Sequence, residues 1–461
     1  MSVDVIFSFD SEDFETPAAD EGELWWADAL TRHGLTGCFC VVGELARALT
    51  RRRRPDVLAA WSRHEIGFHS DLHSAHPLHA EYLEEMGWDD GVAAVMAREA
   101  GGVADIRRLT GQQPAAYCKP GSSWAPQVPA AMALLGIPVF CDAPVEWATG
   151  QPMWYCGTLC IKYHTLFDRY FDVPDRGRRL RDDFLEALDQ RREGGVLVMY
   201  THPCRLITAA PTDTFRFGIN RPRSAWAPAP LHPRTKIEDL MADFDDFLGW
   251  VAHEAGVNVT TYRALLERHR EDDRWLEPAG VAQLIQEAGG PLEPRRIGGH
   301  WLSPAEQLGV LLDAAAWRRD HAELPRLSFV RPLLGPEALA APAEPGEIEV
   351  ADLLTMAAAV NPEVARRGRV PAAVEVARRV VGPGALLRTL AQALHADRER
   401  IAVGPADELP ELARRADFAS LRFRGGWNMF APEFEAPRVL QLARLQTWSA
   451  RPAANQLGAA P

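Results

Sequence analysis

The chain has 461 residues, which is more than one hydrophobic core usually serves, so we expect one large domain and at least one smaller one. Its hydrophobic content of 47% and charged content of 25% are ordinary for globular proteins, and no apolar run approaches the roughly 20 residues that cross a bilayer. The 50 basic and 63 acidic residues give a formal net charge of −13, which disfavours nucleic acid as a partner. The composition therefore predicts a soluble globular protein that binds neither nucleic acid nor a membrane.

The first residues lead directly into an apolar run without a preceding basic segment, so we expect no secretory signal and a cytoplasmic location. All seven cysteines lie within the first 204 residues, without the regular spacing of a disulfide-stapled domain. We expect them to be reduced and mostly buried.

In the first part of the chain, short apolar runs alternate with helix-like stretches. This alternation predicts a parallel sheet flanked by helices, either open or closed into a barrel. Apolar residues at helical spacing between Ile237 and Val251 predict the last long helix of this region. The predicted strands are Val3 to Phe9, Gly37 to Val42, Ile66 to His69, Gly136 to Cys141, Val196 to Tyr200 and Val257 to Thr260.

Near Arg270 the composition changes, because strand-like runs become scarce and alanine, leucine, arginine and proline dominate. We expect a first domain over 1–270, a linker over 271–300, a mainly helical domain over 301–448 and a disordered tail over 449–461. Ser303 and Pro304 are typical of a helix start, with serine as the cap and proline in the first turn.

Two stretches of this second region look loosely alike. One runs from Leu311 to Pro336 and the other from Leu353 to Pro383, and each reads as a helix, a short element ending in proline and a Gly-Pro pair. The pattern resembles pseudomurein-binding-type repeats, but ordinary packing of small helices is the favoured interpretation.

Histidines are concentrated in one short segment: five of the 14 lie between His64 and His79. His69 and His73 are four residues apart, so both rings can point to the same side and offer nitrogen ligands to one divalent ion. Without a carboxylate nearby, histidines on a polar helix face would be the better interpretation.

Acidic residues follow the first predicted strand, where Asp10, Ser11, Glu12 and Asp13 are consecutive. The carboxyl ends of parallel strands carry the active-site groups in such folds, and crowded acids repel one another unless a cation or a proton relieves them. The cluster favours a metal site or a general base; the alternative is an acidic cap for the next helix.

A third candidate, His202, follows the predicted strand that ends at Tyr200. In an alternating fold it would lie at the same edge as Asp10 and His69, where a histidine can donate a proton at neutral pH. By itself it would more often be a core or loop histidine.

Taken in chain order, these pieces resemble the motifs of the polysaccharide deacetylase family, carbohydrate esterase family four, over about residues 3 to 268. The resemblance implies a distorted (β/α)7 barrel, followed here by the smaller helical domain. The segments that carry the resemblance are Ser8-Phe9-Asp10, His69-Ser70-Asp71-Leu72-His73, Tyr117-Cys118-Lys119-Pro120-Gly121 and Leu197 to His202.

The resemblance also implies a division of roles. Asp10 would be the general base and His202 the general acid. His69 and His73 would bind a divalent metal, most simply zinc, together with Glu12 or, failing that, Asp13, because position 11 is serine where the common family pattern has an aspartate.

Lys119 stands where the family usually has an arginine that orients the catalytic aspartate, and we expect it to bind substrate. A lysine can neutralise a carboxylate but lacks the planar fork of arginine. The family's aspartate-tryptophan motif is echoed by Asp142 and Trp147.

The predicted activity is therefore metal-dependent hydrolysis of a C–N amide bond, namely deacetylation of an N-acetylated sugar or a related small or oligosaccharide N-acyl compound. One alternative is a cyclic-amide hydrolase of the allantoinase or imidase type, and another is a non-catalytic glycan-binding protein on a decayed deacetylase domain. Oligomeric state stays open. Four aromatic side chains could line a substrate site or simply fill the core: Trp124, Trp147, Trp154 and Phe167.

Overall fold

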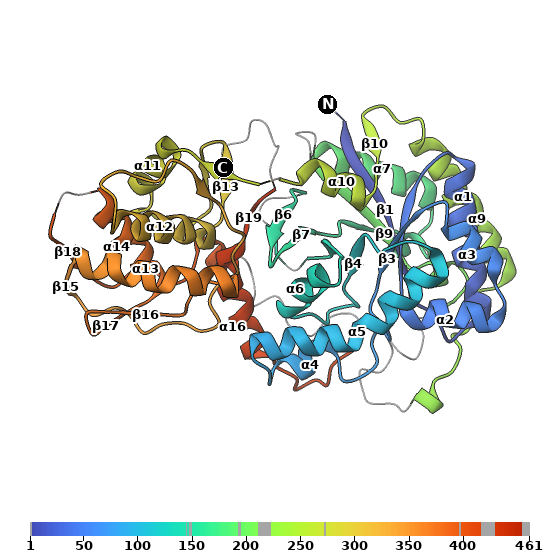
Figure 1. The fold of residues 1–461 in the computed structure, drawn as a ribbon. Helices are drawn as coiled ribbons and strands as arrows, with labels where there is room; N and C mark the ends of the chain where they lie inside the picture. Colours follow the sequence, from blue (N-terminus) through green and yellow to red (C-terminus); the bar gives the residue numbers. More distant parts are fainter. Residues whose placement is uncertain are drawn as a thin grey trace.

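The computed structural model describes residues 2–143, 145–146, 150–191, 195–210, 223–271, 273–395, 398–415 and 429–453. Figure 1 shows two lobes: a barrel built by the blue to green part of the chain and a smaller module built by the yellow to orange part, with the red C-terminal segment between them. Each lobe has its own hydrophobic cluster.

A mostly parallel sheet forms the centre of the larger lobe. Its eleven strands have the order β19-β6-β7-β5-β4-β3-β2-β1-β9-β8, with β10 also paired to β1. The strands are β1 (Val3–Ser11), β2 (Gly37–Val41), β3 (Glu65–Phe68), β4 (Ala116–Cys118), β5 (Val139–Cys141), β6 (Met153–Tyr155), β7 (Thr158–Ile161), β8 (Thr165–Leu166), β9 (Val196–Thr201), β10 (Val257–Val259) and β19 (Arg451–Pro452).

The short connection between β7 and β8 closes the sheet into a barrel. β7 pairs with β5, whereas β8, which begins after a three-residue connection, pairs with β9, and β9 in turn pairs with β1. The ring therefore has seven members, β1, β2, β3, β4, β5, the β7–β8 segment and β9, all joined by parallel pairings. The predicted distorted seven-stranded barrel is confirmed.

Helices cover the outside of this barrel. Along β1, the side chains of Val5, Phe7 and Phe9 pack in the layer between strands and helices, and Ile6 belongs to the interior cluster. Burial on both faces explains why the strand reads as a continuous apolar run. The helices are α1 (Asp20–Arg32), α2 (Gly43–Arg52), α3 (Pro55–Trp61), α4 (His79–Leu83), α5 (Trp88–Thr110), α6 (Gln127–Leu134), α7 (Arg176–Asp189), α9 (Arg234–Val251) and α10 (Tyr262–His269).

The barrel interior is lined by thiols and closed at its base by Tyr262 of α10. The sequence predicted that the cysteines are mostly buried, and all seven are unpaired and buried. Four of them (Cys38, Cys40, Cys118 and Cys141) belong to the interior cluster. Gly67 of β3 makes room for them, because a Cβ there would lie 2.6 Å from Sγ of Cys40. At the opposite end, the interior opens toward the carboxyl ends of the strands.

The smaller lobe contains a duplicated unit with the order strand, helix, hairpin, helix, strand. In each copy the first strand pairs antiparallel with the last, and the hairpin joins the two helices. The first copy comprises β11 (Trp275–Leu276), α11 (Pro278–Glu287), β12 (Arg295–Ile297), β13 (His300–Leu302), α12 (Pro304–Arg318) and β14 (Ser328–Phe329). The second comprises β15 (Gly346–Glu349), α13 (Val350–Arg367), β16 (Val374–Val376), β17 (Arg379–Val381), α14 (Pro383–His395) and β18 (Arg400–Val403).

This duplication differs from the sequence interpretation. Simple packing of small helices is not what the structure shows, and the two stretches compared in the sequence are out of register, because α11 corresponds to α13 and α12 to α14. The matched Leu-Pro and Val-Pro elements mislead, since Pro325 follows α12 whereas Pro371 follows α13. The predicted cap of α12 is present: the Ser303 hydroxyl accepts from the Glu306 N–H, and the Glu306 carboxylate accepts from the Ser303 N–H.

Two predicted boundaries need correction. The region 271–300 is folded rather than a linker, because β11, α11 and β12 contribute Leu276, Val281 and Ile297 to the second core. The expected disordered tail is structured up to residue 453, since β19 pairs antiparallel with β6; residues 454–461 lie outside the described part. The returning segment also contains α15 (Glu411–Arg415) and α16 (Pro437–Gln446), and α16 packs on the barrel lobe through Val439.

Among the described helices, none combines the length and the apolar character that a membrane crossing requires.

Candidate active site

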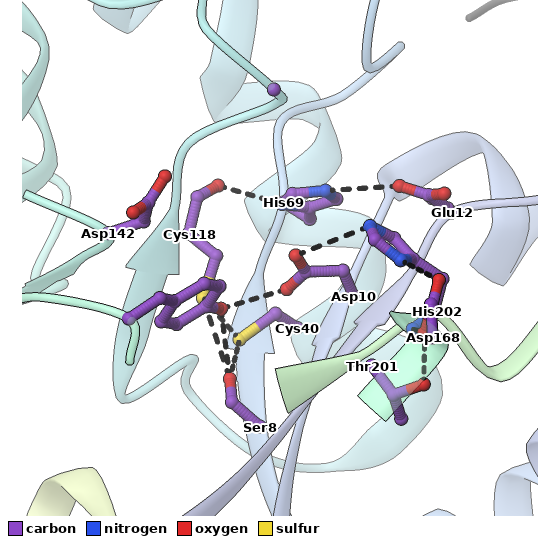
Figure 2. A network of polar contacts seen from close by, with 12 residues as sticks. Ser8, Asp10, Glu12, Cys40, His69, Cys118, Asp142, Asp168, Thr201 and His202 are labelled. Carbon is purple, nitrogen blue, oxygen red and sulfur yellow. Dashed lines mark hydrogen bonds and ion pairs between the residues drawn. The ribbon is translucent and has the colours of Figure 1, made fainter. Parts of the chain in front are cut away.

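The candidate residues meet at the carboxyl edge of the barrel. Asp10 is the penultimate residue of β1, His69 directly follows β3, and His202 directly follows β9. The parallel pairing of these strands and of the intervening β2 brings their ends to one edge. Figure 2 shows the three side chains pointing toward one another beside Glu12.

Glu12, His69 and His73 form the tightest group. Oε2 of Glu12 lies 3.5 Å from Nε2 of His69 and 3.2 Å from Nε2 of His73, and the two Nε2 atoms lie 3.1 Å apart. All three side chains are buried. Two imidazole nitrogens and one carboxylate oxygen therefore converge on one point.

Neighbouring groups aim the two rings. Nδ1 of His69 lies 2.8 Å from the carbonyl oxygen of Cys118, and Nδ1 of His73 lies 2.5 Å from Oγ of Ser74. Donation from Nδ1 of His69 to the carbonyl leaves its Nε2 with a free lone pair, which is how ligand histidines are usually oriented. Burial lowers the pKa of His73 to about 4, which keeps this ring neutral, as a metal ligand must be.

The chemistry of this group fits a divalent cation. The three ligand atoms lie within 4.8 Å of one another, and Oε2 of Glu12 is buried without a hydrogen-bond partner among the described residues. Burial favours the neutral acid, but the charge of His202 and the contacts with His69 and His73 outweigh it and lower the pKa of Glu12 to about 2. Two imidazoles and a carboxylate suit zinc and several other divalent transition metals.

The other acidic candidates have different contacts. Oδ1 of Asp13 accepts the backbone N–H groups of Glu15 and Thr16, so this carboxylate supports the turn after β1, and burial raises its pKa to about 6. The hydroxyl of Ser11 donates to the carboxylate of Glu23 on α1 at 2.7 Å. The structure therefore places Glu12, and not Asp13, with the two histidines.

Asp10 and His202 lie next to this group. Nε2 of His202 is 4.0 Å from Oδ2 of Asp10, while Oδ1 of Asp10 accepts the hydroxyl of Tyr163 at 2.8 Å. Burial raises the pKa of Asp10, and the charges that His69 and His202 carry when protonated oppose that rise. An acid and an imidazole thus face the cavity side by side.

The opposite nitrogen of His202 is held by Asp168, which sequence reasoning missed. Oδ2 of Asp168 lies 2.7 Å from Nδ1 of His202, and its Oδ1 accepts the hydroxyl of Thr201 at 2.6 Å (Figure 2). Although burial disfavours the charged ring, the negative charges of Glu12 and Asp168 raise the pKa of His202 to about 10. A cation bound by Glu12 would oppose this rise.

Lys119 also lies at the site, but its ammonium does not approach the base. It donates to the carboxylate of Asp142 and to the carbonyl oxygen of Gly121. Lys119 and Asp142 both line the pocket. The partner of Asp142 in the aspartate-tryptophan motif, Trp147, lies outside the described residues.

The pocket above these side chains is small, with a volume of about 140 Å³. Its wall also contains Tyr163, Tyr200 and Leu166. Of the aromatic residues singled out in the sequence, Trp124 and Phe167 are buried in the core, and Trp154 of β6 is half-buried away from this pocket. The aromatic residues that line this pocket are thus tyrosines that no sequence signal indicated.

The chain is similar to several solved structures at low sequence identity. No family model matches the chain, and no curated protein does. Among solved structures, a protein from Mycobacterium smegmatis described as a polysaccharide deacetylase matches at 16% identity and a TM-score of 0.38, over 58% of this chain and 90% of that one. An allantoinase matches at 13% identity and a TM-score of 0.40, over 59% and 92% of the two chains.

A 4-alpha-glucanotransferase from Thermococcus litoralis also matches, at 12% identity and a TM-score of 0.40, over 58% of this chain and 40% of that one. These three proteins differ in activity, and a likeness at such low identity says nothing of the reaction. A function for this chain therefore has to be argued from the side chains at the carboxyl edge of its barrel.

Proposed function

We propose that this protein is a metal-dependent hydrolase that cleaves the C–N amide bond of an N-acyl compound. The observation that carries the proposal is the convergence of Glu12, His69 and His73 on one point beside Asp10 and His202. A divalent ion there, most simply zinc, would supply Lewis-acid chemistry, polarising the carbonyl of the amide and making a water molecule more acidic.

Two side chains of this protein would then each transfer one proton. Asp10 would take a proton from the attacking water, as a general base. His202, whose Nδ1 is held by Asp168 and whose Nε2 faces the pocket, would donate a proton to the departing nitrogen. The expected products are a carboxylate and an amine.

The pocket size favours a particular substrate class. A volume of about 140 Å³ is well below the roughly 300 Å³ at which pockets begin to enclose whole ligands. It fits a short acyl group, with the rest of the substrate outside beside Lys119 and Asp142. Deacetylation of an N-acetylated sugar or a related small N-acyl compound is therefore the proposed reaction.

A cyclic-amide hydrolase is the second candidate, because a small pocket could also hold a compact ring. The two activities differ in their products. A deacetylase gives a free carboxylic acid and an amine as separate molecules, whereas a cyclic-amide hydrolase opens a ring and gives a single product. A panel of N-acetyl sugars and of hydantoin-type cyclic amides, with acid and amine release and ring opening measured separately, distinguishes them.

The test compares zinc-loaded wild type with His73→Ala and with a matched control, His253→Ala, whose exposed ring hydrogen-bonds to the carbonyl oxygen of Gly249 near the end of α9. We expect wild type and control to release acetate from an N-acetyl sugar. His73→Ala should lose at least about 100-fold, because even residues that merely support metal ligands cost 10- to 100-fold. Metal binding without turnover on either class would favour a glycan-binding protein instead.

A further inference from the structure

The base Asp10 has an unusual partner. Lys119, the cationic residue of the third motif, donates instead to the carboxylate of Asp142 and to the carbonyl oxygen of Gly121. Oδ1 of Asp10 instead accepts a hydrogen bond from the hydroxyl of Tyr163 at 2.8 Å. A neutral phenol thus contacts the carboxylate where a cation is expected from the sequence.

Tyr163 is fixed on several sides. It lies in the segment between β7 and β8 at which the barrel closes, and it is buried. Its ring stacks on Tyr200 of β9, with centroids 4.3 Å apart and an interplanar angle of 28°. Its hydroxyl oxygen also lies 2.9 Å from Oγ of Ser8 and 2.7 Å from Sγ of Cys118. Little freedom is left for this side chain.

The direction of its proton follows from these contacts. A phenol has one proton to donate, and the carboxylate of Asp10 is the strongest acceptor within reach, so Ser8 can donate in turn to the phenol oxygen. Burial and the neighbouring charge of Asp10 raise the pKa of Tyr163 well above its usual value, so the phenol keeps its proton.

This hydrogen bond fixes one carboxylate oxygen and thereby the other. With Oδ1 held by Tyr163, Oδ2 faces Nε2 of His202 at 4.0 Å, on the side of the Glu12, His69 and His73 group. We infer that Tyr163 is the positioning residue for Asp10. Lys119 instead pairs with Asp142 at the rim of the pocket. The inference rests on the proposed role of Asp10 as the base.

The kinetic test compares Tyr163→Phe with Tyr82→Phe, which removes another buried hydroxyl, one without a hydrogen-bond partner among the described residues. We expect Tyr163→Phe to lower kcat about 10- to 100-fold with KM and metal content unchanged. Lys119→Met should instead raise KM. A kcat of Tyr163→Phe equal to that of Tyr82→Phe would overturn the inference. Ser8→Ala, which removes only one anchor of the phenol, should give a smaller loss of kcat if Tyr163→Phe does not fold.

A second test does not depend on turnover. Tm is measured for Tyr163→Phe, Asp10→Asn and the double variant. If the hydroxyl and the carboxylate are hydrogen-bonded, the loss of Tm in the double variant will differ from the sum of the single losses. Additive losses would contradict the contact itself. If coupling is found but the wild type hydrolyses no amide, the proposed function fails while the contact stands.

Discussion

At the scale of single residues, Asp168 is the contact whose removal is most informative. Asp168→Asn keeps the shape of the side chain but removes the charge that helps to raise the pKa of His202. Because a general acid must be protonated, a lower pKa will move the basic limb of the pH–rate profile to lower pH, and kcat should fall about 10- to 100-fold. The pH dependence of kcat at saturating substrate checks this.

The control for this variant is Asp182→Asn, the same substitution on the exposed face of α7, where the carboxylate pairs with Arg178 across one turn of the helix. Such surface pairs contribute little, so its profile should match the wild type. If Asp168→Asn also behaved like the wild type, His202 would not be the proton donor.

Residue patterns predicted part of the candidate site. Asp10, His69 and His202 could be found because each stands at or directly after an apolar strand, and His73 because of its spacing from His69; their roles stay predictions. Tyr163 lies between β7 and β8, and Asp168 lies in a 3-10 turn (Phe167–Tyr170). They could not be found, because each meets its partner only when the barrel closes. The sequence also could not decide whether Glu12 or Asp13 joins the two histidines, because that depends on the backbone of the turn after β1, to which Asp13 is hydrogen-bonded.

At the scale of elements, β3 depends on having no side chain at Gly67. A methyl group there would lie 2.6 Å from Sγ of Cys40 and 3.1 Å from the carbonyl oxygen of Ala116, in a closely packed interior. Overpacking of this kind costs about 1–3 kcal/mol, so Gly67→Ala should lower the free energy of unfolding by that amount. Denaturant unfolding measures it.

A glycine-to-alanine substitution on an exposed helix face should instead raise the free energy of unfolding. Gly101 lies on the exposed face of α5, and nothing lies within 4 Å of a Cβ at that position. Gly101→Ala should therefore stabilise the protein by about 0.5–1 kcal/mol, since alanine favours the helix. Equal effects of the two substitutions would show that the interior is not packed as described.

The apolar pattern predicted the long strands and some of the short ones. β1, β2 and β9 carry five or more consecutive buried or nearly buried residues, and the three-residue strands β5 and β10 were predicted as well. β4 and β8 were missed, because three and two residues are too few for any periodicity to single them out.

At the scale of the whole molecule, Arg451 joins the two lobes. It follows α16, lies in β19 beside β6, stacks on Trp154, and pairs with Glu271 at 2.9 Å and with Glu306 at 3.3 Å. Arg451→Leu leaves these buried carboxylates with fewer partners, so the free energy of unfolding should fall by about 1–3 kcal/mol. Arg366→Leu, which removes an exposed arginine that pairs with Glu363 on the same helix, is the control and should change it by less than about 0.5 kcal/mol.

Thermal unfolding of both variants gives the comparison, and equal Tm values would mean that Arg451 does not join the lobes. This contact also explains why residues 449–453 were predicted to be disordered: their sequence is polar and rich in alanine, and Arg451 finds its partners more than 140 positions earlier in the chain. The sequence showed two loosely similar stretches but not the correct register of the duplicated unit, because its copies share an order of elements and few residues.

If Glu12, His69 and His73 hold one divalent cation, an anomalous difference map at the zinc absorption edge, from crystals of the zinc-loaded protein, will show it. We expect one peak about 2.0–2.2 Å from a carboxylate oxygen of Glu12 and from Nε2 of both histidines. A peak held by other side chains, or no peak while these three remain side by side, would contradict it.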